Sequence, residues 1–215
     1  MIVTIDGPAG AGKSSVARAL AERLKFNYLD TGAMYRAVTL AAQRAGLVEQ
    51  NGAAIAQLAE RLDIRFAGPR VLLDGEDVTQ AIRTPDVTSL IYIAADNADV
   101  RTRLVDLQRS LAAHGNWVCE GRDQGTVAFG HAQCKIFLTA SAAERARRRQ
   151  EELAQRGSQV PFDEILAQQT ERDARDATRP IGALRKADDA IEVLTDGLSL
   201  EKVVLTLEAI VRSRM

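Results

Sequence analysis

Apolar runs of strand length alternate with longer stretches of helical periodicity along most of this chain. Five short runs rich in apolar residues are bounded by turn-forming residues, as buried strands are. They are Ile2–Ile5, Phe26–Leu29, Trp117–Cys119, Lys135–Leu138 and Ala190–Leu194. Continuous apolar strands are typical of a parallel sheet that is covered on both faces. The pattern therefore predicts an α/β fold with a doubly wound parallel sheet flanked by helices.

Helical periodicity follows several of these runs. In Ser14–Lys25, apolar residues recur at every fourth position and form one stripe. Asp30–Thr31–Gly32 leads into a second helix near Met34–Ala45, which Gly46 can end. After the Asp196–Gly197 turn, the chain closes with another amphipathic helix. These helices are expected to cover the sheet.

Two segments depart from this alternation. Leu62–Ile82 contains short apolar runs joined by Gly68–Pro69 and Asp74–Gly75, so it predicts a small antiparallel insertion. Ser141–Arg179 is helical by propensity, strongly charged and rich in arginine, with one break at Gly157–Pro161. Both are expected to be additions to the parallel core.

Composition excludes some classes of binding partner, although it says little about the fold. The chain has 215 residues, 46% of them hydrophobic and 27% charged, with a net charge of −1, so no basic field predicts binding to nucleic acid or to a membrane. Cys119 and Cys134 have no zinc-binding spacing and lie in strand-like contexts, which predicts buried free thiols in a reducing compartment. The sequence has no secretory leader and no run of about 20 apolar residues, so we expect a cytoplasmic protein.

Gly7–Ser14 carries the most specific chemical signal. It places two glycines four residues apart before a lysine and a serine, between a predicted strand and a predicted helix. Glycines allow successive N–H groups to point into one anion-sized hollow, and the helix adds its positive end. Lys13 can reach the β- and γ-phosphates, and the Ser14 hydroxyl can bind Mg²⁺. The segment predicts a P-loop that holds a nucleoside triphosphate.

The arginines outside this loop favour a phosphorylated acceptor. P-loop proteins include GTPases, motors and small-molecule kinases, and the chain lacks the Asn-Lys-x-Asp run of a guanine-selective switch. A phosphate monoester has a second pKa of about 6, so it needs no base to become a nucleophile. The difficulty is to bring two polyanions together, which guanidinium groups solve. The arginines in question are Arg36, Arg101, Arg122, Arg172, Arg175 and Arg179.

Some arginines have an equally good explanation as solvated helix residues paired with Asp and Glu. This applies most to a run that covers every side of its helix, namely Arg145, Arg147, Arg148 and Arg149. Arg36 and Arg122 follow strand or turn ends, where open α/β sheets place their ligands. We therefore expect those two to bind substrate.

The chain resembles the bacterial-type cytidylate kinases, a group within the nucleoside monophosphate kinases, over nearly its whole length. The resemblance is carried by Ile5–Ser14, Leu29–Arg36, Glu120–Phe129, Lys135–Ala140 and Glu171–Asp176. The Gly-Arg-Asp-x-Gly-Thr-Val run after a strand is the most selective of these motifs. The resemblance implies transfer of a phosphoryl group from Mg·ATP to CMP, and also to dCMP.

It also implies one P-loop kinase domain over residues 1–215 with a five-stranded parallel sheet. The core would comprise about 1–30, 115–144 and 187–215. An acceptor-binding subdomain would span about 31–114, with the antiparallel insertion at about 62–82, and a short helical lid would span about 145–186. The expected partners are the small molecules ATP and CMP or dCMP, with no nucleic acid and no membrane, and the protein is expected to be a monomer.

Roles for individual residues follow from the resemblance. Arg36 and Arg122 would hold the CMP phosphate, and Thr31 would line the same pocket. Arg101 and Asp123 would read the cytosine edge, since a carboxylate accepts from the exocyclic amine and a guanidinium donates to the carbonyl and ring nitrogen. In one departure from the family, Tyr92 stands where a serine is common, with Ser89 nearby.

The remaining roles concern the sugar and the transferred group. Arg172 and Asp176 match the ribose side, and Arg179 matches a lid arginine. The expected catalytic residues are Lys13, Arg122, Arg172 and Arg179. The expected ATP phosphate-binding residues are Gly7, Pro8, Ala9, Gly10, Ala11, Gly12, Lys13, Ser14 and Ser15, with Ser14 as the Mg²⁺ ligand.

Two alternatives remain open at this point. One is a kinase of another nucleoside monophosphate, such as UMP or AMP, or of a small metabolite. The other is a regulatory P-loop ATPase or binding module, which would use the arginines for partner contacts.

Overall fold

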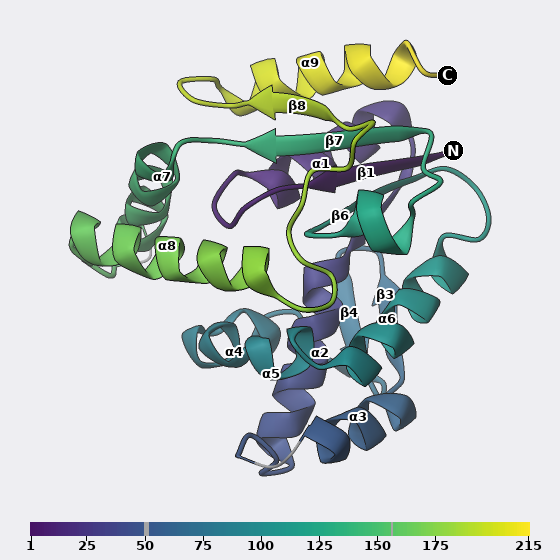
Figure 1. Cartoon of the computed structure of the whole chain (residues 1–215), viewed down its shortest axis with the longest axis vertical. Coiled ribbons are helices and arrows are strands. Elements are labelled where there is room, and N and C mark those ends of the chain that lie inside the picture. The colour runs from purple at the N-terminus through teal and green to yellow at the C-terminus, as the bar shows by residue number, and fades with distance from the viewer. Residues whose placement is uncertain (50–51, 156) are drawn as a thin grey trace. The chain divides into compact units, whose positions relative to one another are not determined.

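The computed structural model describes residues 1–49, 52–155 and 157–215. It forms two compact units, one of Met1–Leu29 with Ala112–Met215 and one of Asp30–Leu111 (Figure 1). Residues 50 and 51, in the predicted acceptor-binding subdomain, and residue 156, in the predicted lid, lie outside the described residues. Within the described ranges, no helix combines the length and the apolar character needed to cross a membrane.

The first unit is built on a parallel sheet of five strands in the order β2-β6-β1-β7-β8. β1 pairs in parallel with β6 and with β7, and β7 pairs in parallel with β8. The strands are β1 Ile2–Asp6, β2 Asn27–Asp30, β6 Trp117–Gly121, β7 Cys134–Thr139 and β8 Ile191–Leu194. The predicted parallel sheet is therefore confirmed, and the P-loop strand β1 lies at its centre.

Two helices cover the hydrophobic core of this unit. α1 (Lys13–Leu24) and α9 (Leu200–Arg212) contact each other, and their apolar faces lie against the sheet. Val16 and Leu20 from α1 are buried with Leu207 and Val211 from α9. These residues have the helical spacing on which the sequence prediction depends, and their burial is a main contribution to stability.

Two further helices and a short π-helix lie at the carboxyl ends of the strands. α7 (Ala142–Gln155) follows β7 and packs against α8 (Phe162–Thr178), and Figure 1 shows β7 running toward α7. The π-helix η2 (Gln124–Ala128) directly follows β6 and the Arg122–Asp123 pair. The predicted helical, charged segment with its break is thus present.

The second unit combines helices with a small antiparallel sheet. Helix α2 (Thr31–Arg44) contacts the short 3-10 helix η1 and helices α3 to α6. These elements are α3 Gly52–Arg61, η1 Ala81–Arg83, α4 Pro85–Leu90, α5 Tyr92–Ala95 and α6 Ala98–Leu111. The sheet has the order β3-β4-β5, formed by Ile64–Ala67, Arg70–Leu73 and Glu76–Asp77. It confirms the predicted antiparallel insertion.

Helix α2 begins earlier than the sequence pattern predicts. It starts at Thr31 rather than near Met34, because Asp30 acts as its N-cap and accepts a hydrogen bond from the Ala33 N–H at 2.9 Å. The segment predicted to lead into the helix is therefore its first turn.

Candidate functional site

The loop between β1 and α1 has the backbone of an anion-binding cradle. Gly7, Gly10 and Gly12 all have positive φ, at 150°, 78° and 86°. A Cβ on Gly7 would lie 1.9 Å from the Leu138 carbonyl oxygen, so no other residue fits there. Gly12 provides no side-chain cap for α1, which leaves the first N–H groups of that helix available to a ligand.

Lys13 is buried beside this cradle. Its Nζ donates a hydrogen bond to the Pro8 carbonyl at 2.8 Å, and only 6% of the residue is exposed. Burial lowers the pKa of Lys13 to about 7, and the charges of Arg122 and Arg172 act in the same direction. A bound polyphosphate would supply negative charge that favours the protonated lysine.

A carboxylate on the neighbouring strand meets the serine of the loop. Glu120 is 5% exposed and lies near the end of β6, in register with Ile5 of β1. Its Oε1 accepts hydrogen bonds from Ser14 Oγ at 2.5 Å and from Tyr28 Oη at 3.2 Å. No acidic metal ligand was predicted from the sequence, although Glu120 is an acid at the end of the strand beside β1.

The donor set at Ser14 and Glu120 fits a hard divalent cation. Hydroxyl and carboxylate oxygens are ligands that Mg²⁺ prefers, and Mg²⁺ usually takes few protein ligands together with water and substrate phosphates. The described part of the chain has no group of three or more His, Cys, Asp or Glu side chains placed to hold a metal.

Arg122, Asp176 and Arg179 form a chain of ion pairs. Arg122 Nε donates to Asp176 Oδ2 at 2.9 Å, and Arg179 Nη2 donates to Asp176 Oδ1 at 2.6 Å. Burial acts to raise the pKa of Asp176, but the charges of these arginines and of Arg172 outweigh it and hold the pKa below its ordinary value. The charge of Arg172 also lowers the pKa of Lys13. The first unit therefore brings five predicted site residues to one region.

Asp123 lies at the start of η2 and is 3% exposed. Its carbonyl accepts a hydrogen bond from the Val127 N–H at 2.8 Å. The rest of the predicted set, Thr31, Arg36 and Arg101, belongs to the second unit. The structure thus divides the predicted residues between two units.

In the second unit, Thr31 is the buried first residue of α2. Arg36 Nη1 donates to Thr88 Oγ1 at 2.6 Å. Arg101 on α6 is 3% exposed; its Nη1 donates to the Ala95 carbonyl at 3.0 Å, and its guanidinium carbon lies 5.3 Å from the centre of the Tyr35 ring. A buried guanidinium of this kind suits recognition of a planar polar group.

Tyr92 and Ser89, the two residues of the departure from the family pattern, are both exposed. Tyr92, at the start of α5, is 40% exposed. Ser89 Oγ donates to the Asp86 carbonyl within α4 at 2.8 Å.

The arginine run on α7 separates into two kinds of residue. Arg147 and Arg149 pair with glutamates of their own helix, as the solvated-helix explanation expects. Arg145 is buried, and its guanidinium donates to the Ala9 carbonyl of the P-loop at 2.9 Å and pairs with Asp173 of α8 at 2.6 Å. The run therefore contains a structural contact to the cradle that sequence reasoning missed.

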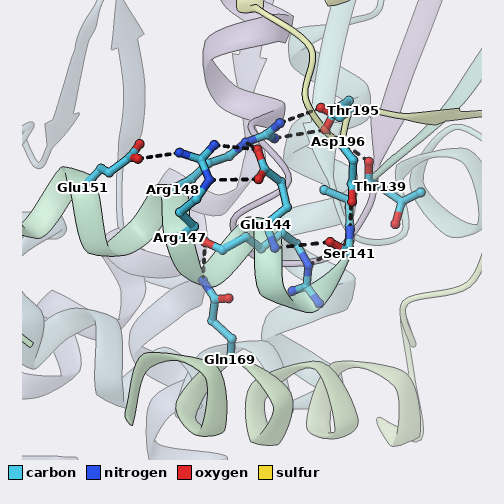
Figure 2. A network of polar contacts seen from close by, with 11 residues as sticks. Thr139, Ser141, Glu144, Arg147, Arg148, Glu151, Gln169, Thr195 and Asp196 are labelled. Carbon is cyan, nitrogen blue, oxygen red and sulfur yellow. Dashed lines mark hydrogen bonds and ion pairs between the residues drawn. The ribbon is translucent and has the colours of Figure 1, made fainter. Parts of the chain in front are cut away.

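Arg148 connects α7 to the turn after β8. Its Nη2 donates to the Thr195 carbonyl at 2.6 Å and its Nε to Glu144 Oε1 at 2.9 Å. In the same network, the Ser141 N–H donates to Asp196 Oδ1 at 2.8 Å. Figure 2 shows these groups meeting between α7 and the segment that carries Thr195 and Asp196. Because Arg149 lies four residues after Arg145 and so shares its helical face, no spacing within the run distinguishes the two kinds of arginine.

Comparison with known proteins agrees with this geometry. The family model described as "Cytidylate kinase" matches residues 3–213. The chain is 50% identical over 203 residues to a protein named cytidylate kinase from Rhodopirellula baltica, covering 94% of this chain and 89% of the relative. It is also 50% identical over 217 residues to a cytidylate kinase from Carboxydothermus hydrogenoformans, covering 98% and 97%.

Solved structures support the fold. A shikimate kinase from Bacteroides thetaiotaomicron superposes with a TM-score of 0.52 at 14% identity, covering 99% of this chain and 98% of that one. An uncharacterized protein from Eubacterium ventriosum superposes with a TM-score of 0.54, also at 14% identity, covering 99% and 98%.

Proposed function

The chain belongs to the cytidylate kinase family, and we propose that it transfers the γ-phosphoryl group of ATP directly, in line, onto the phosphate of CMP and of dCMP. The observation that carries this proposal is the presence, in one unit, of a glycine cradle with a buried lysine and of a network of arginines around Asp176. The cradle suits a triphosphate and the arginines suit a second polyanion.

The donor half of the site is the segment Gly7–Ser15. Its backbone N–H groups and the first turn of α1 would bind the ATP phosphates. Lys13 would form its ion pair with the β- and γ-phosphates in place of its hydrogen bond to Pro8. Ser14 would hold Mg²⁺, with Glu120 beside it, and Mg²⁺ when bound supplies positive charge to the phosphate oxygens.

For the acceptor, Arg36 and Arg122 would each bind the CMP phosphate and Thr31 would contact the same substrate, while Arg101 and Asp123 would read the base. A carboxylate at Asp123 would accept from the cytosine amine, whereas the carbonyl of uracil at that place would face a second acceptor. Leaving such groups unmatched in a buried site costs about 1–3 kcal/mol. We expect this to select CMP over UMP.

The sugar and the lid complete the assignment. Asp176 would accept a hydrogen bond from a ribose hydroxyl, and Arg172, whose charge acts on Asp176, would add positive charge on the same side. Arg179 would reach the transferring phosphoryl from the lid, the segment of about 145–186 that contains most of α7 and all of α8. The segments 1–30, 115–144 and 187–215 would form the core, and 31–114 the acceptor-binding subdomain.

No general base is needed for this reaction. The phosphate of CMP is largely dianionic at neutral pH, because its second pKa is about 6. Catalysis then depends on alignment of the two substrates and on positive charge at the transferring group. Lys13, Arg122, Arg172 and Arg179 would provide that charge.

We further propose that the protein acts as a cytoplasmic monomer on small-molecule substrates, without nucleic acid or membrane partners. Cys119 and Cys134 are buried free thiols, a state that a reducing compartment maintains. The net charge of −1 gives no basic field for a polyanionic macromolecule.

One experiment tests the function. ADP release is followed with Mg·ATP and CMP, dCMP, UMP, AMP, GMP or no acceptor. We expect CMP and dCMP to give the highest kcat/KM, with little release in the absence of an acceptor. Preference for UMP, AMP or a different phosphorylated metabolite would contradict the assignment of the acceptor, and release that no monophosphate stimulates would favour the regulatory ATPase.

A further inference from the structure

Asp6 joins the P-loop strand to the segment that follows Arg122 and Asp123. It is the last residue of β1, directly before Gly7, and only 4% of it is exposed. Its Oδ1 accepts the Gln124 N–H at 2.8 Å, and its Oδ2 accepts the Gly125 N–H at 2.7 Å. Both carboxylate oxygens therefore bind backbone of η2.

These two hydrogen bonds orient the start of the π-helix. The first N–H groups of a helical segment have no partner within it, so a carboxylate is a favourable cap for them. Inside η2, the Val127 N–H donates to the Asp123 carbonyl and the Phe129 N–H donates to the Gln124 carbonyl. With its first turn attached to Asp6, the segment has a defined position relative to the P-loop strand.

Gly125 allows this close approach. A Cβ on Gly125 would lie 3.0 Å from Thr4 Oγ1 and 3.3 Å from Asp6 Oδ2 and from Lys135 Cδ. Such spacings are tighter than a side chain normally tolerates, so an added methyl group would push the N–H of Gly125 away from the carboxylate. The absence of a side chain at Gly125 therefore allows its N–H to reach the Asp6 carboxylate.

The contact continues into the proposed acceptor half of the site. Arg122, two residues before Gln124, donates to Asp176 Oδ2 at 2.9 Å, and Asp123 lies between them in the chain. A shift of the first turn of η2 would therefore move Arg122 and Asp123, which are proposed to bind the phosphate and the base of CMP. Among the described residues, the Asp6 side chain accepts its hydrogen bonds from Gln124 and Gly125, whereas Lys13 of the P-loop donates to the Pro8 carbonyl.

The charge state of Asp6 agrees with this geometry. Burial raises the pKa of Asp6 to about 6, with the nearby charge of Asp123 acting in the same direction, whereas the Gly125 and Gln124 N–H groups and the charge of Lys13 lower it. At neutral pH the carboxylate is therefore mainly ionised, and both oxygens can accept. An asparagine would accept only one N–H and would turn an NH₂ donor toward the other.

We propose that Asp6 is a positioning residue that holds Arg122 and Asp123 in place against the P-loop strand, so that it determines the affinity for CMP. This inference rests on the proposed function, because it concerns the acceptor half of the same site. Asp6 would thus act on CMP, whereas the P-loop residues that follow it in the chain act on ATP.

The test compares Asp6→Asn and Gly125→Ala with a matched control, Thr4→Val. Thr4 lies two residues before Asp6 on β1, is fully buried, and its Oγ1 has no hydrogen-bond partner among the described residues. Valine preserves its shape and leaves the Asp6 contact intact. Circular dichroism checks the fold of each variant, and Gly125→Ala, which retains every charge, carries the test if Asp6→Asn does not fold.

The readout is the KM for CMP against the KM for ATP. We expect both test variants to raise the KM for CMP by about tenfold or more while the KM for ATP changes by less than about threefold, and Thr4→Val to change neither. An unchanged KM for CMP, or an equal rise for both substrates, in a folded test variant would overturn the inference while CMP turnover by the wild type stands. If the wild type does not turn over CMP, the proposed function fails and this inference falls with it.

Discussion

At the scale of single residues, the site gathers charges that destabilise one another in the absence of substrate. Lys13 is buried near Arg122 and Arg172, and its pKa falls from 10.5 to about 7. The folded protein therefore holds this proton less tightly than the unfolded chain does. Binding sites for polyanions commonly have this property, because the ligand compensates for the buried positive charge.

Lys13→Met should separate the effect of this charge on catalysis from its effect on stability. We expect kcat to fall by roughly 10²-fold or more, as for loss of a group that stabilises transition-state charge, with CMP binding retained. Between pH about 7 and 10.5 the unfolded wild type binds more protons than the folded form, so wild-type stability rises with pH over this window.

Methionine lacks this proton, so the variant should be more stable than the wild type at pH 6, and the difference should shrink as the pH rises above about 7. Urea unfolding at several pH values measures it. A difference that does not vary with pH would contradict the lowered pKa, and near-normal turnover would contradict the role of Lys13.

Asp123→Ala tests base selection at the same scale. Removal of the carboxylate should lower the ratio of kcat/KM for CMP to that for UMP by about tenfold, because the acceptor that distinguishes the two bases is lost. Thr126→Ser is a suitable control, since Thr126 is an exposed residue of η2 and serine keeps the hydroxyl that donates to the Asp123 carbonyl. An equal CMP/UMP ratio of kcat/KM in the two variants would show that Asp123 does not select the base.

At the scale of elements, the strands and their flanking helices follow from local patterns, and several helices do not. No helix was predicted over the range of α6, whose buried face carries Arg101 and Gln108 beside Val100, Leu104 and Val105. Polar residues on a buried face weaken the apolar periodicity on which such predictions depend. The π-helix η2 also has no sequence pattern that predicts it, because its first turn is held by Asp6, a residue of β1 that is distant in the chain.

Asp30 shows how one side chain can define an element. Asp30→Ala should remove both the N-cap of α2 and the ion pair in which Arg83 Nη2 lies 3.0 Å from Asp30 Oδ2. We expect a loss of about 1–2 kcal/mol in the free energy of unfolding. Asp30→Asn keeps a capping oxygen and should lose less; equal losses for the two variants would show that the cap contributes little. Urea denaturation of both variants provides the comparison.

At the scale of the whole molecule, we expect α7 and α8 to close over ATP when both substrates are bound. Both contact the cradle: Arg145 donates to the Ala9 carbonyl, and a Cβ on Gly10 would meet Gln169 Nε2 of α8 at 2.9 Å. The turn between the two helices contains Ser158 and Pro161, both outside helical structure. Loop segments of this kind can absorb a change in lid position.

Limited proteolysis tests that motion. We expect cleavage within residues 157–161 to slow markedly when an analogue that joins ATP to CMP is bound, and to slow less with ATP alone, because closure should require both substrates. Cleavage after the carboxyl-terminal helix α9 serves as an internal control. Equal rates with and without the analogue would argue against a lid at this turn.

The sequence by itself determined the parallel sheet, the P-loop, the antiparallel insertion and the family. Each depends on residues that are close in the chain: apolar runs of strand length, glycines at a short fixed spacing, and contiguous motifs such as Glu120–Phe129. Local sterics and periodicity are sufficient to specify such features. For the same reason, the residues of the cradle could be named without a structure.

Only the tertiary structure decided which side chains meet. Asp6 contacts Gln124 across 118 positions of sequence, Ser14 contacts Glu120 across 106, and Arg122 contacts Asp176 across 54. These contacts depend on the strand order, which places β6 beside β1, and on the packing of α8, and no local pattern encodes either. They also separated Arg145 and Arg148 from the solvated arginines of the same run, because burial and partners are properties of the folded chain.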